Sequence, residues 1–60
     1  MKKWRIENTI SGVVLGEYEG ETGAQALDAC ARDAGYADYA DLLSRTPAPE
    51  DGEILVTEIG

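Results

Sequence analysis

Histidine is missing from this chain, and cysteine is represented by Cys30 alone. Without histidine, no side chain has an ordinary pKa suited to acid–base catalysis near neutral pH. A single thiol cannot form an internal disulfide, and a cysteine-based zinc site needs further ligands that the chain lacks. Cys30 lies among alanines on an expected helix, so we interpret it as a small packing residue and not a nucleophile. The sequence therefore predicts neither an enzyme nor a cofactor.

Basic residues are also scarce. The chain has five of them against twelve acidic residues, which gives a formal net charge of -7 and a pI of about 4.2. An acidic surface repels nucleic-acid phosphates and anionic lipids, so direct binding to nucleic acid or to a membrane is disfavoured. Long apolar runs are absent too, and the charged residues that follow Met1 do not fit a secretory signal. We therefore expect a cytoplasmic protein.

The length allows a single domain, which we place at residues 1–60. Apolar residues make up 43% of the chain and charged residues 28%, as in ordinary globular proteins. A chain of this composition is expected to fold, although its core is small.

Three segments have the pattern of strands. Side chains alternate between apolar and charged over Lys2–Glu7, and a second strand is expected over Val13–Glu19. The short connection between them favours an antiparallel hairpin. Gly16 indicates a bulge or a close backbone approach inside the second strand. The last strand is expected over Glu53–Ile59.

A helix is predicted between the second and the last of these strands. Thr22 is a suitable N-cap, and Gln25 completes a capping box with it. Apolar residues, including Leu27, follow at helical spacing from about Gly23 to Ala34. Gly35 ends the helix, because glycine readily adopts the left-handed conformation of a C-terminal cap.

A second, shorter helix follows. Asp38 is its expected N-cap, and the apolar spacing extends to about Ser44. Pro47 and Pro49 end it, and residues 48–52 are expected to form an acidic surface loop.

The resulting order is strand, strand, helix, short helix, strand. A right-handed crossover places the third strand beside the first and antiparallel to it. We therefore predict an α+β domain with a three-stranded antiparallel sheet in the order 2-1-3. Both helices cover one face of the sheet, and the other face is open.

Two motifs suggest ligand sites, but neither is convincing. The spacing of the helical aspartates does not match that of an EF-hand calcium loop; these residues are Asp28, Asp33, Asp38 and Asp41. Residues 20–23 precede a helix N-terminus that could hold a phosphate. Three glutamates crowd that end and oppose an anion, namely Glu17, Glu19 and Glu21. We predict neither a metal site nor a phosphate site.

Apolar residues occur on both faces of the expected sheet, and this is the most informative functional signal. One set faces the helices, and the other remains exposed in a monomer. An exposed apolar patch usually marks an interface with a second copy or with a partner protein. We select as the candidate interface Val14, Tyr18, Ile54 and Val56.

The segment Gly20-x-Thr22, followed by Ala26-Leu27 and Cys30, resembles the strand-to-helix segment of HicB-type antitoxin domains. That resemblance implies a hairpin followed by a helix and a further strand. It also implies a domain that binds and blocks a small RNA-cleaving toxin. The chain lacks the proline-rich segment that precedes the helix in that family, and no catalytic or ligand residue is implied.

We therefore expect a non-enzymatic protein-interaction module of bacterial or phage origin, with an antitoxin-like action as one form of that function. It would bind through an open sheet face or an edge strand. The alternative is an acidic mimic of nucleic acid that occupies the groove of a basic nucleic-acid-binding protein, as an inhibitor of phage or anti-defence type.

Overall fold

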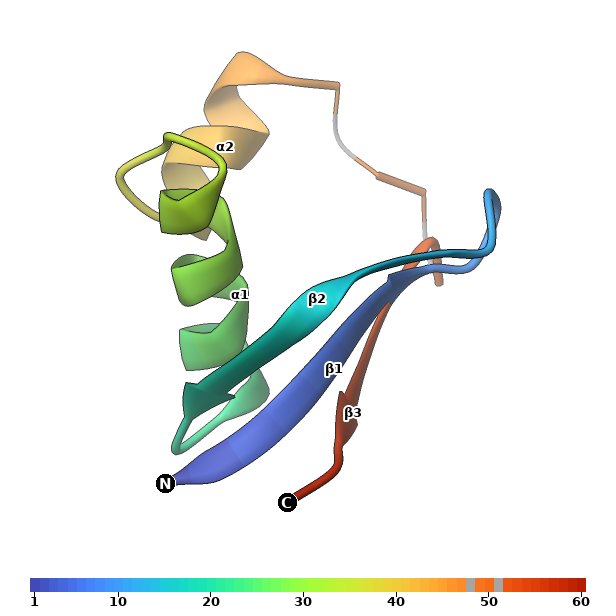
Figure 1. Cartoon of the computed structure of the whole chain (residues 1–60). Helices are drawn as coiled ribbons and strands as arrows, with labels where there is room; N and C mark the ends of the chain where they lie inside the picture. Colours follow the sequence, from blue (N-terminus) through green and yellow to red (C-terminus); the bar gives the residue numbers. More distant parts are fainter. Residues whose placement is uncertain (48, 51) are drawn as a thin grey trace.

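Strand β1 (Lys2–Asn8) lies between β2 (Val13–Gly20) and β3 (Ile54–Glu58) in the computed structural model of the chain. Both neighbours are antiparallel to β1. Helices α1 (Gly23–Asp33) and α2 (Tyr39–Arg45) connect β2 to β3 and lie on one side of the sheet (Figure 1). The structure describes residues 1–47, 49–50 and 52–60. The predicted α+β fold, its element order and its sheet order 2-1-3 are confirmed.

Several element boundaries differ from the predicted ones by one residue. β1 continues to Asn8, α1 ends at Asp33 and α2 extends to Arg45, whereas β3 is shorter than expected at both ends. The predicted acidic loop over residues 48–52 falls partly on positions 48 and 51, which lie outside the described residues.

A bulge interrupts the hairpin between β1 and β2. Ile6 lies opposite Gly16, whereas the next residue, Glu7, lies opposite Val14, so that Leu15 is the extra residue. One inserted residue reverses the alternation of side chains along the bulged strand. Val14 and Gly16, which flank Leu15, therefore lie on opposite faces of the sheet, whereas an uninterrupted strand would place them on the same face.

The N-caps of both helices lie where the sequence places them. The Thr22 hydroxyl accepts a hydrogen bond from the Gln25 amide at 3.2 Å, and the Asp38 carboxylate accepts one from the Asp41 amide at 2.8 Å. The capping box is modified, because the Gln25 side chain accepts from the amide of Glu21 and not from that of Thr22.

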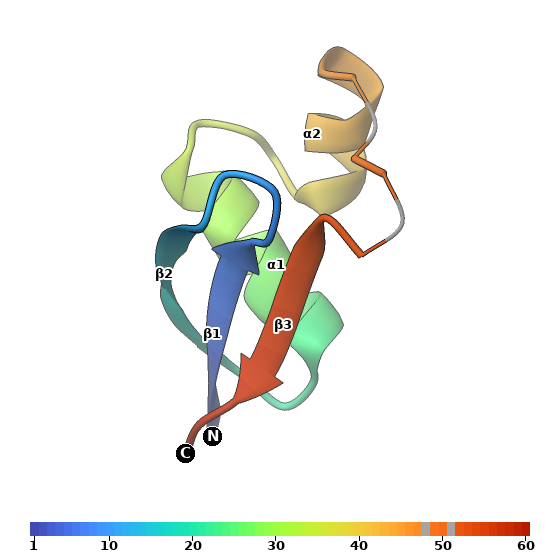
Figure 2. The ribbon, with the colours of Figure 1, turned by 90° about the vertical axis from the view of Figure 1, so that its right-hand side faces the viewer.

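The core is built on Ile6, the one large side chain that is completely buried among the described residues. Ala26 and Ala31 of α1 are buried with it, because small side chains let the helix axis approach the sheet closely. Leu27, which the sequence places on the same stripe, is only half-buried. α1 packs mainly on β2, and α2 packs on α1 and not on the strands. Figure 2 shows α1 behind the sheet and α2 beyond the end of the strands.

Trp4 extends this core toward the other end of the sheet. Its indole N–H donates to the Gly20 carbonyl at 3.0 Å. Gly23 at the start of α1 lies against the Trp4 ring and Val56, and a Cβ at this position would lie 3.2 Å from a methyl carbon of Val56, which is a tight contact. The helix therefore touches the sheet through alanine and glycine positions along its length.

The C-terminus of α1 has the expected glycine cap. Gly35 has φ of +99°, the Tyr36 amide donates to the Ala31 carbonyl at 2.9 Å, and the Gly35 amide donates to the Arg32 carbonyl at 3.0 Å. This pair of bonds is the Schellman arrangement, and it turns the chain toward α2.

We expect Gly35→Val to lower the free energy of unfolding by about 1 kcal/mol more than Gly35→Asn does. No atom lies within 4 Å of a Cβ added at this position, so the cost comes from the positive φ and not from a clash. Asparagine tolerates this conformation far better than a β-branched residue. Urea unfolding of the two variants measures the difference, and equal midpoints would contradict the cap described above.

Candidate interaction surface

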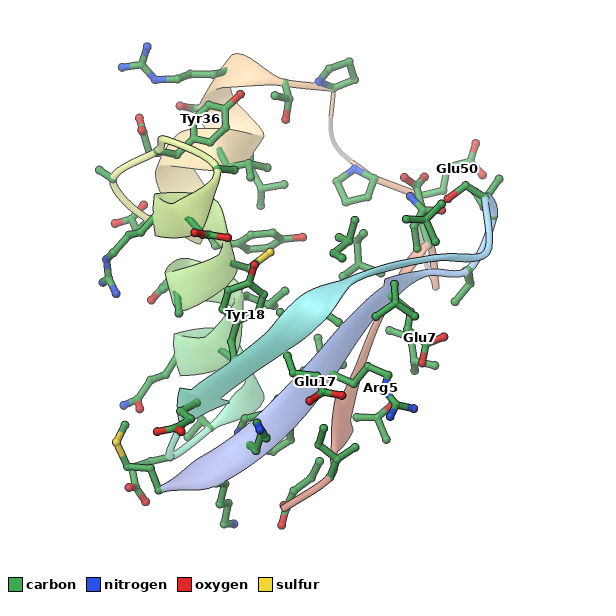
Figure 3. All side chains as sticks on the ribbon, in the orientation of Figure 1. Arg5, Glu7, Glu17, Tyr18, Tyr36 and Glu50 are labelled. Carbon is green, nitrogen blue, oxygen red and sulfur yellow. The ribbon has the colours of Figure 1, made fainter. Side chains whose placement is uncertain are left out.

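The sheet face away from the helices combines charged and apolar side chains. Glu17 of β2 lies between two basic residues of β1, with N···O distances of 3.8 Å to Lys3 and 3.6 Å to Arg5. Figure 3 shows Arg5, Glu7 and Glu17 on the side of the sheet opposite α1. Val14 and Leu55 flank Glu7 in the neighbouring strands. The open face is therefore a charged centre with apolar margins, and not a continuous apolar patch.

The apolar side chains of these margins are substantially exposed. Val14 is 52% exposed, Leu55 is 47% exposed and Ile59, just after β3, is 38% exposed. Leu55 and Ile59 belong to the set on the last strand that the candidate interface left out. The sequence could not rank the two sets, because residues 54, 55, 56 and 59 are all branched and apolar.

The four residues of the candidate interface do not share a face, so that part of the prediction is wrong. Val14 is on the open face, opposite Glu7. The other three face the helices, with partners on β1 that point the same way; these are Tyr18 opposite Trp4, Ile54 opposite Asn8 and Val56 opposite Ile6. The bulge at Leu15 explains the error on β2. Its one extra residue puts Val14 and Tyr18 on opposite faces of the sheet, although their even spacing in the sequence predicts a shared face.

Tyr18 therefore packs on the helix side of the sheet. Its ring lies toward α1 (Figure 3), and its hydroxyl donates a hydrogen bond to Asp33 at 3.0 Å. Partial burial of the ring, followed by this hydrogen bond, raises the pKa of Tyr18 to about 12. Burial also raises the pKa of Tyr39, which lies across α1 on α2. Neither tyrosine is available on the open face.

A cavity of about 200 Å³ lies between the sheet and the helices. Its walls are mostly apolar and come from every element, with Ile6, Leu27, Leu42 and Ile54 among the contributors. Cys30 lies on the same wall and is half-buried. The cavity is smaller than the roughly 300 Å³ at which small-molecule sites begin, and few polar groups converge on it. It is a packing gap that accounts for the incomplete burial of Leu27.

No protein-family model matches the chain, and comparisons with curated proteins and with solved structures find no match. Over the described residues, no helix has the length and apolar character needed to cross a membrane. Within the same residues, no group of three or more potential metal-ligating side chains comes together.

Val14 and Val56 lie on opposite faces of the sheet, so the same substitution should affect stability differently at the two positions. Val14→Lys should change the free energy of unfolding by less than about 0.5 kcal/mol, because the new ammonium is solvated and lies opposite Glu7. Val56→Lys should cost about 1–3 kcal/mol, because Val56 is half-buried against Gly23. Chemical denaturation of both variants checks the ranking. A reversed order would mean that the faces are assigned wrongly.

The Tyr18–Asp33 contact generates a second prediction. The folded-state pKa of Tyr18 lies above its ordinary value of 10.0, so folding favours the neutral phenol. This contribution to stability is complete below pH 10 and is lost as the pH rises toward 12. Thermal melts across that range should show a decline that is smaller in Tyr18→Phe. An ultraviolet titration should show one phenol that ionises last and is absent from the variant, and a parent with no such late step would contradict the contact.

Proposed function

We propose that this chain is a non-enzymatic protein-interaction module that binds a protein partner through its sheet. The observation that carries the proposal is the location of the exposed apolar side chains. Among the described residues, three of the large exposed hydrophobic side chains lie on the open face of the sheet; these are Val14, Leu55 and Ile59. α1 packs on the other face of the same sheet, so the open face is the free surface of the sheet.

The mixed character of this face supports a partner that associates and dissociates. Non-obligate interfaces are about as apolar as an ordinary protein surface, whereas obligate dimers resemble a divided core. The ion pairs of Glu17 keep the centre of the open face soluble in the free protein. Self-association through the open face would bring these charged centres together, so a foreign protein partner is the better-supported occupant.

We place the protein in the cytoplasm in this proposal, since Cys30 is a free thiol and needs no oxidising environment. An antitoxin-like role, in which the domain blocks a toxin, is one form that the interaction could take. The hairpin, helix and further strand that the resemblance to HicB-type domains implies are all present. No residue of the chain is assigned to catalysis.

A second candidate is an acidic mimic of nucleic acid, and one observation favours it. Ion pairs within the chain occupy four of the five basic side chains, namely Lys2, Lys3, Arg5 and Arg45. The other carboxylates are not in these ion pairs, and they make the electrostatic potential of the protein surface negative. They could occupy a basic groove on a nucleic-acid-binding protein.

Site-specific cross-linking tests the proposed function. A photoreactive amino acid replaces Leu55 on the open face or, as the matched control, Ala40 on the exposed side of α2. After irradiation in extract of the organism that encodes the chain, mass spectrometry identifies the captured protein. We expect the same protein from repeated captures at position 55 and not at position 40. Equal capture at both positions would argue against a sheet-mediated interaction.

Salt dependence separates the two candidates once the captured protein is purified. The screening length falls from about 10 Å at 0.1 M salt to about 3 Å at 1 M. Binding by a nucleic-acid mimic should weaken steeply across this range, and added DNA should compete with it. Binding through apolar contacts on the sheet should change little, and DNA should have no effect.

A further inference from the structure

The outer edge of β3 carries backbone groups that no strand pairs within the described structure. The Thr9 amide donates to the Glu53 carbonyl at 2.7 Å, and the Ile59 amide donates to the Lys3 carbonyl at 2.8 Å. Residues two apart along a strand direct their N–H and C=O groups the same way, so the odd-numbered residues of this segment face β1. The groups that point outward belong to Ile54, Val56 and Glu58. Figure 2 shows β3 at the margin of the sheet, and the sheet order gives it one neighbouring strand.

The opposite edge of the sheet is protected. β2 carries the bulge at Leu15 and a glycine with φ of +150° at position 16, which distort the edge. Glu17 is held in ion pairs, and Glu19 adds a second charge. α1 also packs mainly on β2. Bulges, charges and covering elements are the usual means by which proteins prevent an edge strand from pairing.

β3 has fewer of these protections. It contains no proline or lysine, its register with β1 is regular, and three of its five residues are Ile54, Leu55 and Val56. β-branched residues favour an extended backbone, so the edge is already in the conformation that a further strand requires. The short length of β3 is its main protection, and it limits an added strand to about three outward-facing residues.

The charge around β3 indicates what kind of strand would fit. Among the described residues of the segment 46–60, three are acidic and none is basic; the acidic residues are Glu50, Glu53 and Glu58. Lys2 of β1 lies 3.7 Å from Glu58 in an exposed ion pair, which offsets a small part of this charge. A second copy would bring the same negative segment against itself, whereas a basic segment would be attracted.

We infer that the β3 edge is a docking site for an extended, basic segment of the protein partner, which adds as a fourth strand beside β3. Main-chain hydrogen bonds to the outward-facing residues supply the affinity. Apolar side chains of the segment lie opposite Ile54 and Val56, and a lysine or arginine lies opposite Glu58. This inference rests on the proposed protein-binding function and assigns it to one edge of the sheet.

The test uses a short synthetic peptide of alternating valine and threonine with lysines at both ends. Two-dimensional NMR of the isotopically labelled full chain should show the largest shifts at the amides of Ile54, Val56 and Glu58. Those amides should also exchange more slowly with solvent when the peptide is bound. A peptide with glutamates in place of the lysines, and one with alternate amides methylated, should each bind at least about tenfold more weakly, since each removes a charge or a backbone donor.

Variants at Glu58 distinguish the contribution of its backbone N–H to peptide binding from that of its side-chain charge. Glu58→Pro removes an outward N–H without removing a bond to β1, so the fold should persist while the peptide affinity falls about tenfold. Glu58→Gln keeps the N–H and should weaken binding less. Should Glu58→Pro fail to fold, the methylated peptide makes the same test on the parent chain.

Three results would overturn the inference. They are shifts that map to β2 or to the open face, equal binding of the glutamate peptide, and concentration-dependent shifts of the β3 amides without peptide, which would identify a second copy as the occupant. If cross-linking from position 55 captures a partner while the peptide fails to bind β3, the docking site is wrong and the proposed function stands. If cross-linking shows no sheet-specific partner, the proposed function itself fails.

Discussion

The burial of Ile6 between the central strand and the small residues of α1 is the contact on which the rest of this domain depends. Ile6 is completely buried, and the helix above it contributes Ala26 and Ala31, which have little volume of their own. Burial of one such side chain stabilises a protein by about 1.5–3 kcal/mol, which is a large part of the stability that a domain of this length can have. The close approach of helix and sheet therefore matters more than the number of large side chains.

That close approach also determines what remains exposed. Because α1 sits mainly over β2 and α2 packs on α1, the helices leave a cavity of about 200 Å³ above the sheet, and the outer edge of β3 has no neighbouring strand within the described structure. The face behind the sheet receives no cover in this arrangement, so its side chains must be compatible with water. The ion pairs between β1 and β2 and the apolar margins at Val14 and Leu55 follow from this requirement.

The two edges of the sheet are unequal for physical reasons. The extra residue at Leu15 bends β2 and breaks its register, and the glutamates of that strand add charge. β3 is regular and apolar, but it is short and lies in an acidic segment. An edge of this kind discourages pairing with a second copy of the chain while it remains accessible to a segment of opposite charge. Selectivity for a basic partner then needs no pocket.

Local patterns in the sequence are enough to predict the α+β class, the order of elements, the strand order and, to within one residue, the ends of both helices. These features depend on local signals: Thr22 and Asp38 as caps, Gly35 at a positive φ, and the alternation of side chains in β1. Which apolar residues of β2 and β3 are buried depends on tertiary contacts. One inserted residue at Leu15 reverses the faces of β2, and in β3 every candidate side chain is apolar, so hydrophobicity alone cannot distinguish them. The choice is made by pairing with β1 and by the position of α1, which are contacts between residues distant in sequence.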